Sequence, residues 1–261
     1  MSKKPSLFEL LEEYSSLFKG HYSIVSKEME IRLAMWMDCL RILSKSGNRT
    51  YSLVNLNSGK MEAGFKAYSK RDEHPTIHLL CPVEKKKLLD SYHRKDCYQN
   101  IETMNLFYNK LMSLPFGQRM EFVLNCLQRF KNKIGNYDIY LIRVSVIEYD
   151  ALGIPWILLV EAELLREYNI DDFYPIRQFV LLNKENGGVE KHFDNLNINH
   201  LTDQEFKVLK LAENKSTIKE MADQLSVSEH TIKSHRYQVM KKLNAPSLPL
   251  ACSLARSMRI I

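Results

Sequence analysis

The sequence contains no long apolar run and only 9 glycines among its 261 residues. No segment approaches the roughly 18 consecutive apolar residues of a transmembrane helix, and the N-terminal residues lack the uninterrupted apolar core of a signal peptide. The glycines form no Walker loop, no GxGxxG motif and no Gly-x-Ser-x-Gly motif. These absences predict a cytoplasmic protein that has no membrane segment and is not an enzyme.

Cysteine is also scarce. The 5 cysteines are odd in number and form no CxxC motif, so we expect reduced thiols rather than disulfides or a zinc site. His74, His78 and Cys81 have a spacing that a metal or haem could use, but Pro75 interrupts a helix there. We expect a loop entering a helix at this position and identify no cofactor. A metal-dependent N-terminal enzyme using His74 and His78 is kept as one alternative.

Three helix starts can be recognised in the last sixty residues. Thr202 and Thr217 are each followed three residues later by a glutamate, Glu205 and Glu220, and form capping boxes. Ser228 is a good N-cap for a third helix. The expected second and third helices are separated only by a short turn, which indicates a helix-turn-helix unit.

The third helix has two different faces at 100° per residue. Ile232, Val239 and Leu243 fall together and are expected in a small core. The opposite face is polar, aromatic and cationic, which suits DNA better than it suits an ordinary solvated helix, the alternative. The residues expected to contact DNA are Thr217, Ser228, His230, Thr231, Lys233, Ser234, His235, Tyr237 and Lys241.

The members of this set have different expected roles. Lys233 can donate to guanine O6 and N7, Ser234 can bond to several base edges, and Tyr237 can contact a thymine methyl or a phosphate. Backbone phosphates set register without reading sequence. The residues better placed for phosphates are Thr231, His235 and Lys241.

Residues 200–261 resemble the LuxR-type (GerE-like) four-helix DNA-binding domain. The resemblance lies in Leu-Thr at 201–202, Val-Leu at 208–209, Lys-Glu-Met-Ala at 219–222, Ser-x-x-Thr-Ile-Lys-x-His at 228–235 and Lys-Lys-Leu at 241–243. It implies a third helix in the major groove of double-stranded DNA, with base reading by Lys233, Ser234 and Tyr237. Lys215 stands where the family usually has glycine, so we expect Asn214 to adopt the left-handed conformation.

A fourth helix is expected from about Ser247 to Met258. Its apolar stripe consists of Leu250, Ala251, Leu254 and Met258. The family resemblance implies that this stripe forms a homodimer on two-fold related half-sites one DNA turn apart. The alternative is that the stripe only packs on the other three helices.

The first 195 residues predict an α+β domain. Helical spacing occurs around residues 7–18 and 29–43, a hairpin is expected around residues 51–68, and residues 83–131 look helical. Alternating residues then predict strands at 138–149, 156–163 and 176–182. In the second of these, Trp156, Leu158 and Val160 are expected on one face. A polar linker from Asn183 to Asn199 leads to the DNA-binding domain, which we assign to residues 200–261.

The order of elements between about residues 48 and 185 resembles the PAS sensor fold, a five-stranded antiparallel sheet with helices across one face. This resemblance implies a sensory or dimerising module, so we predict a transcriptional regulator whose N-terminal domain senses a small molecule or another signal. The alternative is an N-terminal domain that only dimerises or binds another protein. Charge agrees with DNA binding, because a net +4 of the chain's +6 lies in residues 200–261.

Overall fold

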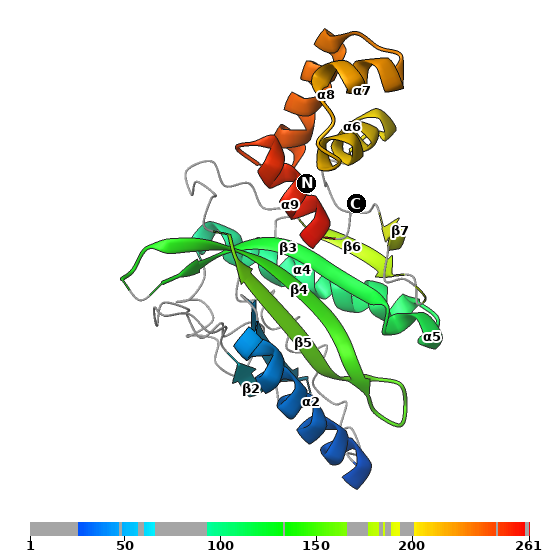
Figure 1. The fold of residues 1–261 in the computed structure, drawn as a ribbon. Coiled ribbons are helices and arrows are strands. Elements are labelled where there is room, and N and C mark those ends of the chain that lie inside the picture. The colour runs from blue at the N-terminus through cyan, green and yellow to red at the C-terminus, as the bar shows by residue number, and fades with distance from the viewer. Residues whose placement is uncertain are drawn as a thin grey trace, which may run out of the picture.

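The computed structural model describes residues 26–46, 49–56, 60–65, 93–132, 134–165, 177–182, 189–193, 201–243 and 245–258, together with positions 185 and 261. The first part of the chain forms a sheet domain of helices and strands, and the last part forms a helical domain (Figure 1). The elements of the sheet domain are α2 (Lys27–Ser46), β1 (Arg49–Asn55), β2 (Lys60–Phe65), α4 (Arg94–Ser113), α5 (Phe116–Arg119), β3 (Phe122–Lys131), β4 (Tyr137–Tyr149), β5 (Pro155–Leu164), β6 (Arg177–Leu182) and β7 (Val189–Phe193). Those of the helical domain are α6 (Asp203–Glu213), α7 (Ile218–Leu225), α8 (Glu229–Lys242) and α9 (Leu248–Ser257).

The sheet has seven strands in the order β2-β1-β5-β4-β3-β6-β7, and every neighbouring pair is antiparallel. The predicted α+β class and antiparallel sheet are confirmed. The first five strands form one contiguous block, and β6 and β7 extend it beyond the five strands that we expected. Strand β7 lies in the segment predicted to be a polar linker, because Val189–Phe193 pairs with β6. The boundary near residue 195 lies outside the described residues and stays a prediction.

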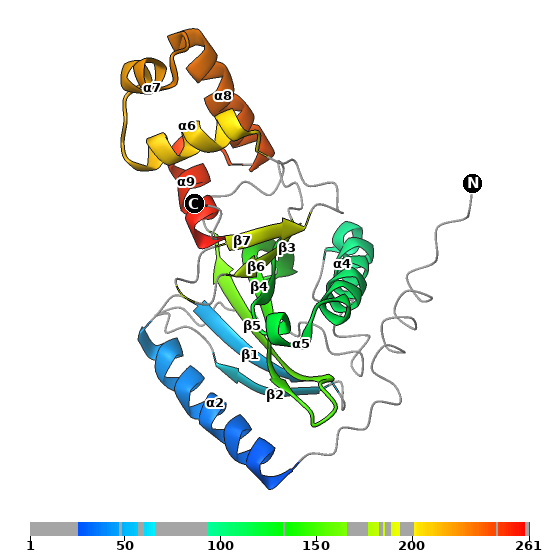
Figure 2. The ribbon, with the colours of Figure 1, turned by 90° about the vertical axis from the view of Figure 1, so that its right-hand side faces the viewer.

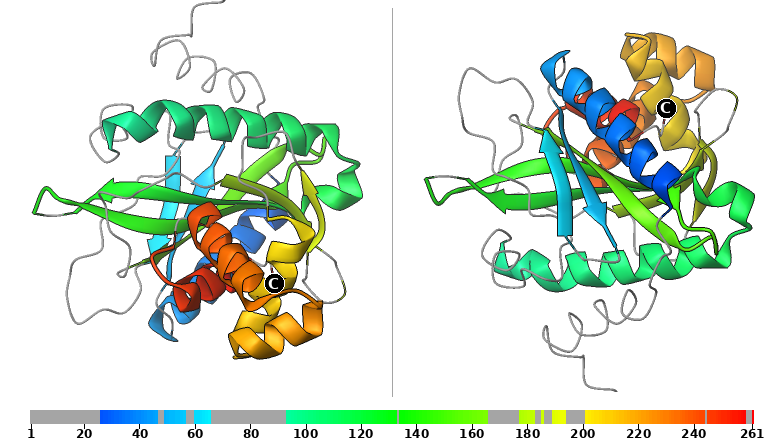
Figure 3. Two further views of the ribbon diagram at one scale, coloured as in Figure 1. Left: turned by 90° about the horizontal axis from the view of Figure 1, so that it is seen from above. Right: turned by 90° about the horizontal axis from the view of Figure 1, so that it is seen from below.

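Helices cover both faces of this sheet (Figures 2 and 3). On the inner face, α4 packs against alternate residues of the central strands, and the shared core includes Phe107, Leu124, Ile142 and Val160. On the outer face, Met29 and Leu40 of α2 form a second cluster with Leu53 of β1. Figure 3 shows α9 on this same outer side, opposite α4. The expectation of helices across one face is therefore too narrow.

The predicted helix over the middle of the chain ends earlier than expected. Helix α4 is present, but Phe122–Lys131 forms β3 rather than a second helical stripe. Phe122, Leu124 and Phe130 belong to the inner core, whereas Leu127 belongs to the outer one. A strand buried on both faces has a nearly continuous apolar sequence, so its period cannot be distinguished from that of a buried helix.

The prediction that Trp156 shares a face with Leu158 and Val160 is wrong, because Trp156 belongs to a different cluster. It lies in the outer cluster with Met29 and Leu53 under α2, while Leu158 and Val160 lie in the inner core. The pairing of β4 with β5 shifts register between Glu148, which pairs with Ile157, and Tyr149, which pairs with Pro155, so that it passes over Trp156. A bulge of this kind breaks the simple alternation on which the prediction was based.

One buried ion pair fixes α4 against the edge of β3. Arg129 donates from Nε to Asp96 Oδ2 at 2.8 Å and from the terminal nitrogen to Asp96 Oδ1 at 2.7 Å. The two side chains are 12% and 5% exposed. His93 Nδ1 lies 3.1 Å from the same guanidinium and its ring contacts Tyr137 edge to face. A bidentate pair of this kind fixes the position and the tilt of the helix start.

Candidate DNA-binding interface

Helices α6, α7 and α8 begin with the N-caps that the sequence predicts. Thr202 Oγ1 accepts from the Glu205 backbone N–H at 3.3 Å, and Glu205 Oε2 accepts from the Thr202 N–H at 2.6 Å. Thr217 and Glu220 make the same reciprocal pair at the start of α7. At α8, Ser228 Oγ accepts from the Thr231 N–H at 3.1 Å. All three predicted caps are present, so each helix starts at the expected residue.

Two turn residues adopt a left-handed conformation without being glycine. Ser226, between α7 and α8, has φ of 53°, and Lys215, between α6 and α7, has φ of 61°. Lys215 therefore takes the glycine-like conformation itself, and Asn214, for which we expected it, has φ of −74°. The strain of an L-residue in this region is about 1–2 kcal/mol, and the capped helices on both sides hold the turn in place.

A small core orients α8. Ile232 shares a buried cluster with Val208, Met221 and Ala222, and Val239 and Leu243 belong to a neighbouring cluster with Leu209. The predicted core face of the third helix is thus confirmed. Because this face is buried against α6 and α7, the opposite face of α8 points away from the domain (Figure 1).

The predicted DNA-contacting residues lie together at the N-termini of α7 and α8 and on the outward face of α8. Those that are exposed are Thr217, Ser228, His230, Lys233, Ser234, Tyr237 and Lys241, whereas Thr231 and His235 are half-buried. Thr217 and Ser228 use their hydroxyls as caps. Tyr237 is 59% exposed. Among the described residues, Lys233, Ser234 and Tyr237 have no side-chain hydrogen-bond or ion-pair partner, so their polar groups are available to a ligand.

Glu205 and Lys242 connect the start of α6 to the end of α8. Lys242 Nζ lies 2.8 Å from Glu205 Oε2, and the Glu205 side chain is 5% exposed. Burial raises the pKa of this carboxyl, but the hydrogen bonds from Lys242 and from Thr202 outweigh it, so the pKa lies below its ordinary value. The charged form therefore stabilises the folded domain.

The sign of this shift predicts an acid-sensitive domain. A carboxyl whose pKa is lower in the folded state adds stability above its unfolded pKa, about 4.3, and loses it as the pH falls through the folded value. We expect the free energy of unfolding to fall on acidification below pH of about 4.5, and the slope to be smaller in Glu205→Gln. Urea unfolding of both proteins at several pH values measures this; equal slopes would contradict it.

The stripe predicted for dimerisation is not exposed in this structure. Ala251, Leu254 and Met258 of α9 are 0%, 2% and 0% exposed, and Leu250 is half-buried. They share a buried cluster with Leu127 of β3 and with Ile139 and Leu141 of β4, on the outer face of the sheet. The stripe thus packs on the sheet as well as on its own domain, and its role in a dimer stays a prediction.

Sequence reasoning did not find this contact between α9 and the sheet. Asn125 of β3 donates from Nδ2 to the Met258 carbonyl oxygen at 3.2 Å, across 133 positions of sequence. Asn125 is 1% exposed. A polar residue in the middle of an apolar strand was the one available signal, and it does not identify its partner.

The helical spacing around residues 7–18 and the residues His74, His78 and Cys81 lie outside the described residues. Within the described part of the chain, no group of three or more histidine, cysteine or acidic side chains could hold a metal ion. No helix in that part combines the length and apolar composition that spanning a bilayer requires.

These four helices, with their capped starts, short turn and outward-facing basic helix, form a helix-turn-helix DNA-binding domain. Residues 199–255 match the family of bacterial regulatory proteins of the luxR type, GerE. This segment is therefore a LuxR-type helix-turn-helix domain, as its motifs predicted. No curated protein matches the chain.

Solved structures of VqmA show a distant likeness over most of the chain. VqmA bound to DPO is 10% identical, over 85% of this chain and 86% of that one, with a TM-score of 0.27. A Vibrio cholerae VqmA–ligand–DNA complex is 11% identical over 85% and 86% with a TM-score of 0.28. The V. cholerae VqmA dimer in the absence of target DNA is 12% identical over 84% and 86%, also with a TM-score of 0.28. With identities and TM-scores this low, we assign no ligand and no operator to this chain from the likeness.

Proposed function

We propose that this protein is a cytoplasmic, sequence-specific DNA-binding transcriptional regulator that acts as a homodimer on two-fold related half-sites. The observation that supports it most is the outward face of α8, where Lys233, Ser234 and Tyr237 are exposed while Ile232 and Val239 are buried. A helix oriented by its core in this way can enter the major groove with its N-terminal half.

The residues on this face are assigned to two kinds of contact, with base edges and with backbone phosphates. Lys233 and Ser234 lie near the N-terminal end of α8, where recognition helices reach base edges, and Tyr237 lies one turn later. The free N–H groups at the start of α7 and α8 favour phosphate oxygens nearby. Lys241 lies two turns beyond Lys233, at the end of α8, and is therefore assigned to the phosphate backbone.

The assignment of Lys241 predicts a change in salt dependence. Replacing Lys241 by alanine removes one phosphate contact, so fewer counterions are released on binding. We expect affinity to fall to a similar degree for all DNA sequences and the slope of log K against log salt to decrease by about one. Fluorescence anisotropy titrations with specific and random duplexes at several salt concentrations measure both. An unchanged slope would exclude a phosphate contact by Lys241.

The N-terminal domain is proposed to sense a small molecule on the inner face of its sheet. Gln128 lies on that face, directly opposite Tyr140 on the neighbouring strand, and is 2% exposed. Its Nε2 donates to Cys126 Sγ at 3.2 Å, while its buried Oε1 accepts no hydrogen bond from the described residues. The buried Asn100 Nδ2 of α4 likewise has no acceptor among them. Each such group costs about 1–3 kcal/mol unless a partner is supplied, which favours a polar ligand.

This proposal predicts opposite effects on ligand binding and on stability in Gln128→Leu. Leucine removes the buried acceptor, so a ligand that donates to Oε1 should bind about five- to 150-fold more weakly, while the fold should be unchanged or more stable. Native mass spectrometry of the freshly purified protein detects an adduct that is lost on denaturation, and Gln99→Leu on α4 serves as control. An adduct of equal occupancy in Gln128→Leu would contradict this site.

One observation favours the alternative, a domain that dimerises or binds protein without a ligand. The outward side of α2 exposes Ile31, Met35 and Ile42 by 53%, 62% and 68%, and these residues fall within one narrow stripe at helical spacing. An exposed stripe of this kind is typical of a helix that packs on another subunit. It is compatible with a ligand on the opposite face of the sheet, so both functions can be present in the same domain.

A further inference from the structure

The outer face of the sheet contains a docking site for α9. Leu127 and Leu141 lie directly opposite each other on β3 and β4, and Ile139 lies next to them. All three are less than 5% exposed and share one cluster with Ala251, Leu254 and Met258. Apolar residues on the outer face of a sheet are buried only if something covers them. Among the described residues, those of the last helix of the helical domain contribute to this cover, together with Leu165, Leu201 and Ile261.

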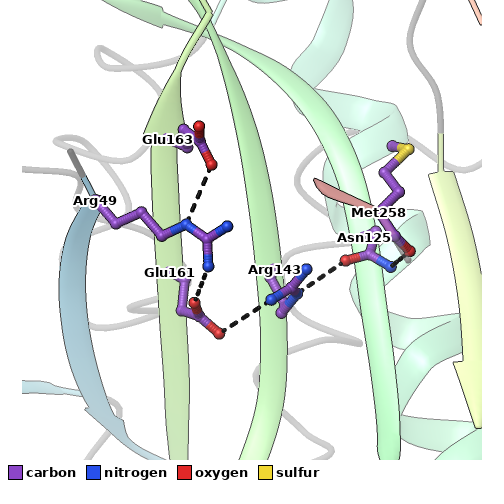
Figure 4. A network of polar contacts seen from close by, with 6 residues as sticks. All are labelled: Arg49, Asn125, Arg143, Glu161, Glu163 and Met258. Atoms are coloured by element: carbon purple, nitrogen blue, oxygen red, sulfur yellow. Dashed lines mark hydrogen bonds and ion pairs between the residues drawn. The ribbon is translucent and has the colours of Figure 1, made fainter. Parts of the chain in front are cut away.

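A polar network locks this contact at one end (Figure 4). Asn125 donates to the Met258 carbonyl at the C-terminus of α9, and its own Oδ1 accepts from Arg143 Nε at 3.2 Å. An α-helix leaves its last carbonyl groups without intrahelical partners, so Asn125 satisfies one of them. The nearby Arg143 cation also favours the negative end of the helix dipole.

The network continues along the outer face of the sheet, from β3 through β4 and β5 to β1. Arg143 lies opposite Glu161 on β5, with 3.8 Å between the charged groups. Arg49 of β1 then bonds to both Glu161 and Glu163 at 3.1 Å. Two cations and two anions therefore balance each other on adjacent strands, and the burial of these groups makes their mutual positions matter. A change in strand positions at β1 or β5 would reach Asn125 through these contacts.

From this arrangement we infer that the sheet competes with a second copy of this chain for the apolar stripe of α9. While α9 is docked, Ala251, Leu254 and Met258 are covered, so two helical domains cannot pair through them. Release of α9 uncovers the part of this stripe that the sheet covers, and a two-fold contact would pair this part with the same part of a second copy. Docking of α9 would then lower the affinity of the protein for paired DNA half-sites, and this consequence rests on the proposed function.

A ligand on the inner face of the sheet could change the balance between docked and released α9. The inner and outer faces of β3 and β4 are built from alternating residues of the same strands, Gln128 on one side and Leu127 on the other. A ligand changes the balance only if it binds the docked and released states with different affinity. A ligand that displaced β3 on the inner face would also move Leu127 and Asn125, which lie on the same strand, and would then bind the two states with different affinity.

The first test needs no DNA. Ser253 is exposed on α9, so a Ser253→Cys protein in which Cys39 and Cys81 are replaced by serine can be cross-linked between subunits with a short bismaleimide. The three remaining native cysteines, Cys97, Cys126 and Cys252, are buried and react slowly. Burial also raises the pKa of the Cys252 thiol and that of Cys97, the latter to about 11. Removing the latch with Asn125→Ala is expected to increase the cross-linking rate about three- to tenfold.

Matched variants separate release of α9 from damage to the fold. Ser145 follows Arg143 by two residues on β4 and belongs neither to the cluster around α9 nor to the polar network, so Ser145→Ala should leave the rate unchanged. Arg143→Gln, which removes the partner of Asn125 Oδ1, should increase the rate by a smaller factor. Hydrogen exchange of α9 amides should increase in the same order, with unchanged circular dichroism. Unchanged cross-linking and exchange in both Asn125→Ala and Arg143→Gln would overturn the inference.

DNA titrations of the same proteins then test the consequence separately. Tighter binding by Asn125→Ala, in proportion to cross-linking, supports both the docking site and the proposed function. Increased cross-linking in a protein that binds no duplex supports competition for α9 but contradicts the DNA-binding function. Unchanged cross-linking in a protein that binds DNA normally contradicts the competition alone.

Discussion

Replacing Arg129 by methionine is expected to lower the free energy of unfolding of the sheet domain by about 3–5 kcal/mol. Methionine has similar length and apolar character to the arginine stem, so packing changes little. The Asp96 carboxylate, whose side chain is 5% exposed, would lose both hydrogen bonds from the guanidinium and remain charged in a buried position. Urea unfolding followed by tryptophan fluorescence reports on this domain, because both tryptophans, Trp36 and Trp156, belong to its outer cluster.

Two further variants distinguish a buried charge from loss of side-chain packing. Lys131→Met, two residues later on the same strand and exposed, should change stability by less than about 0.5 kcal/mol. The double variant Asp96→Leu/Arg129→Met should recover much of the loss, since replacing both partners of a buried pair by apolar residues is often neutral. A loss below about 1 kcal/mol in Arg129→Met would show that Asp96 is solvated without its partner.

The DNA-binding domain could be predicted from the sequence because its determinants are local. Each capping box involves residues three positions apart, as for Thr202 with Glu205, and the turn before α8 has few residues in which to reverse the chain. Helical periodicity then assigns Ile232 and Val239 to the core without knowledge of any other element. Lys215 is the exception, because the sequence does not show which of two adjacent residues takes the strained conformation.

The sheet domain was harder to predict because its determinants are distant in sequence. The choice between helix and strand for residues 122–131 depends on α4 covering one face and α9 covering the other. A single sequence does not show that α4 and α9 pack on these two faces of the strand. Residues 190–192 are all polar, and Val189–Phe193 forms a strand because β6 offers an edge with which to pair. Tertiary contacts therefore override local propensity in both segments.

The relation between the two domains is the part that sequence reasoning could not supply. The sequence predicts the stripe on α9 from Leu250, Leu254 and Met258, and it is compatible with both a dimer contact and packing within the helical domain. The structure adds a third partner, the outer face of β3 and β4. Because apolar surfaces are not directional, a stripe alone does not specify its partner, whereas the hydrogen bond from Asn125 to Met258 does.

Replacing Lys233 by alanine is expected to weaken binding to the specific operator by about 1–3 kcal/mol, roughly five- to 150-fold. Lys233 is exposed near the N-terminal end of α8, and its ammonium has no partner among the described residues. In the major groove this group can donate to guanine O6 and N7, which no other base pair presents in the same arrangement. The loss should therefore concentrate at one base position of each half-site.

The operator is first selected from randomised duplexes with the unaltered protein, and single-base variants of it are then titrated against Lys233→Ala and Lys241→Ala at constant salt. Both variants lose one positive charge on the same helix, so the general electrostatic loss is matched between them. We expect Lys233→Ala to bind several bases equally at one position, and Lys241→Ala to keep the original preference at every position. Equal weakening for all sequences by both variants would show that Lys233 contacts phosphate, and base reading would then have to depend on Ser234 and Tyr237.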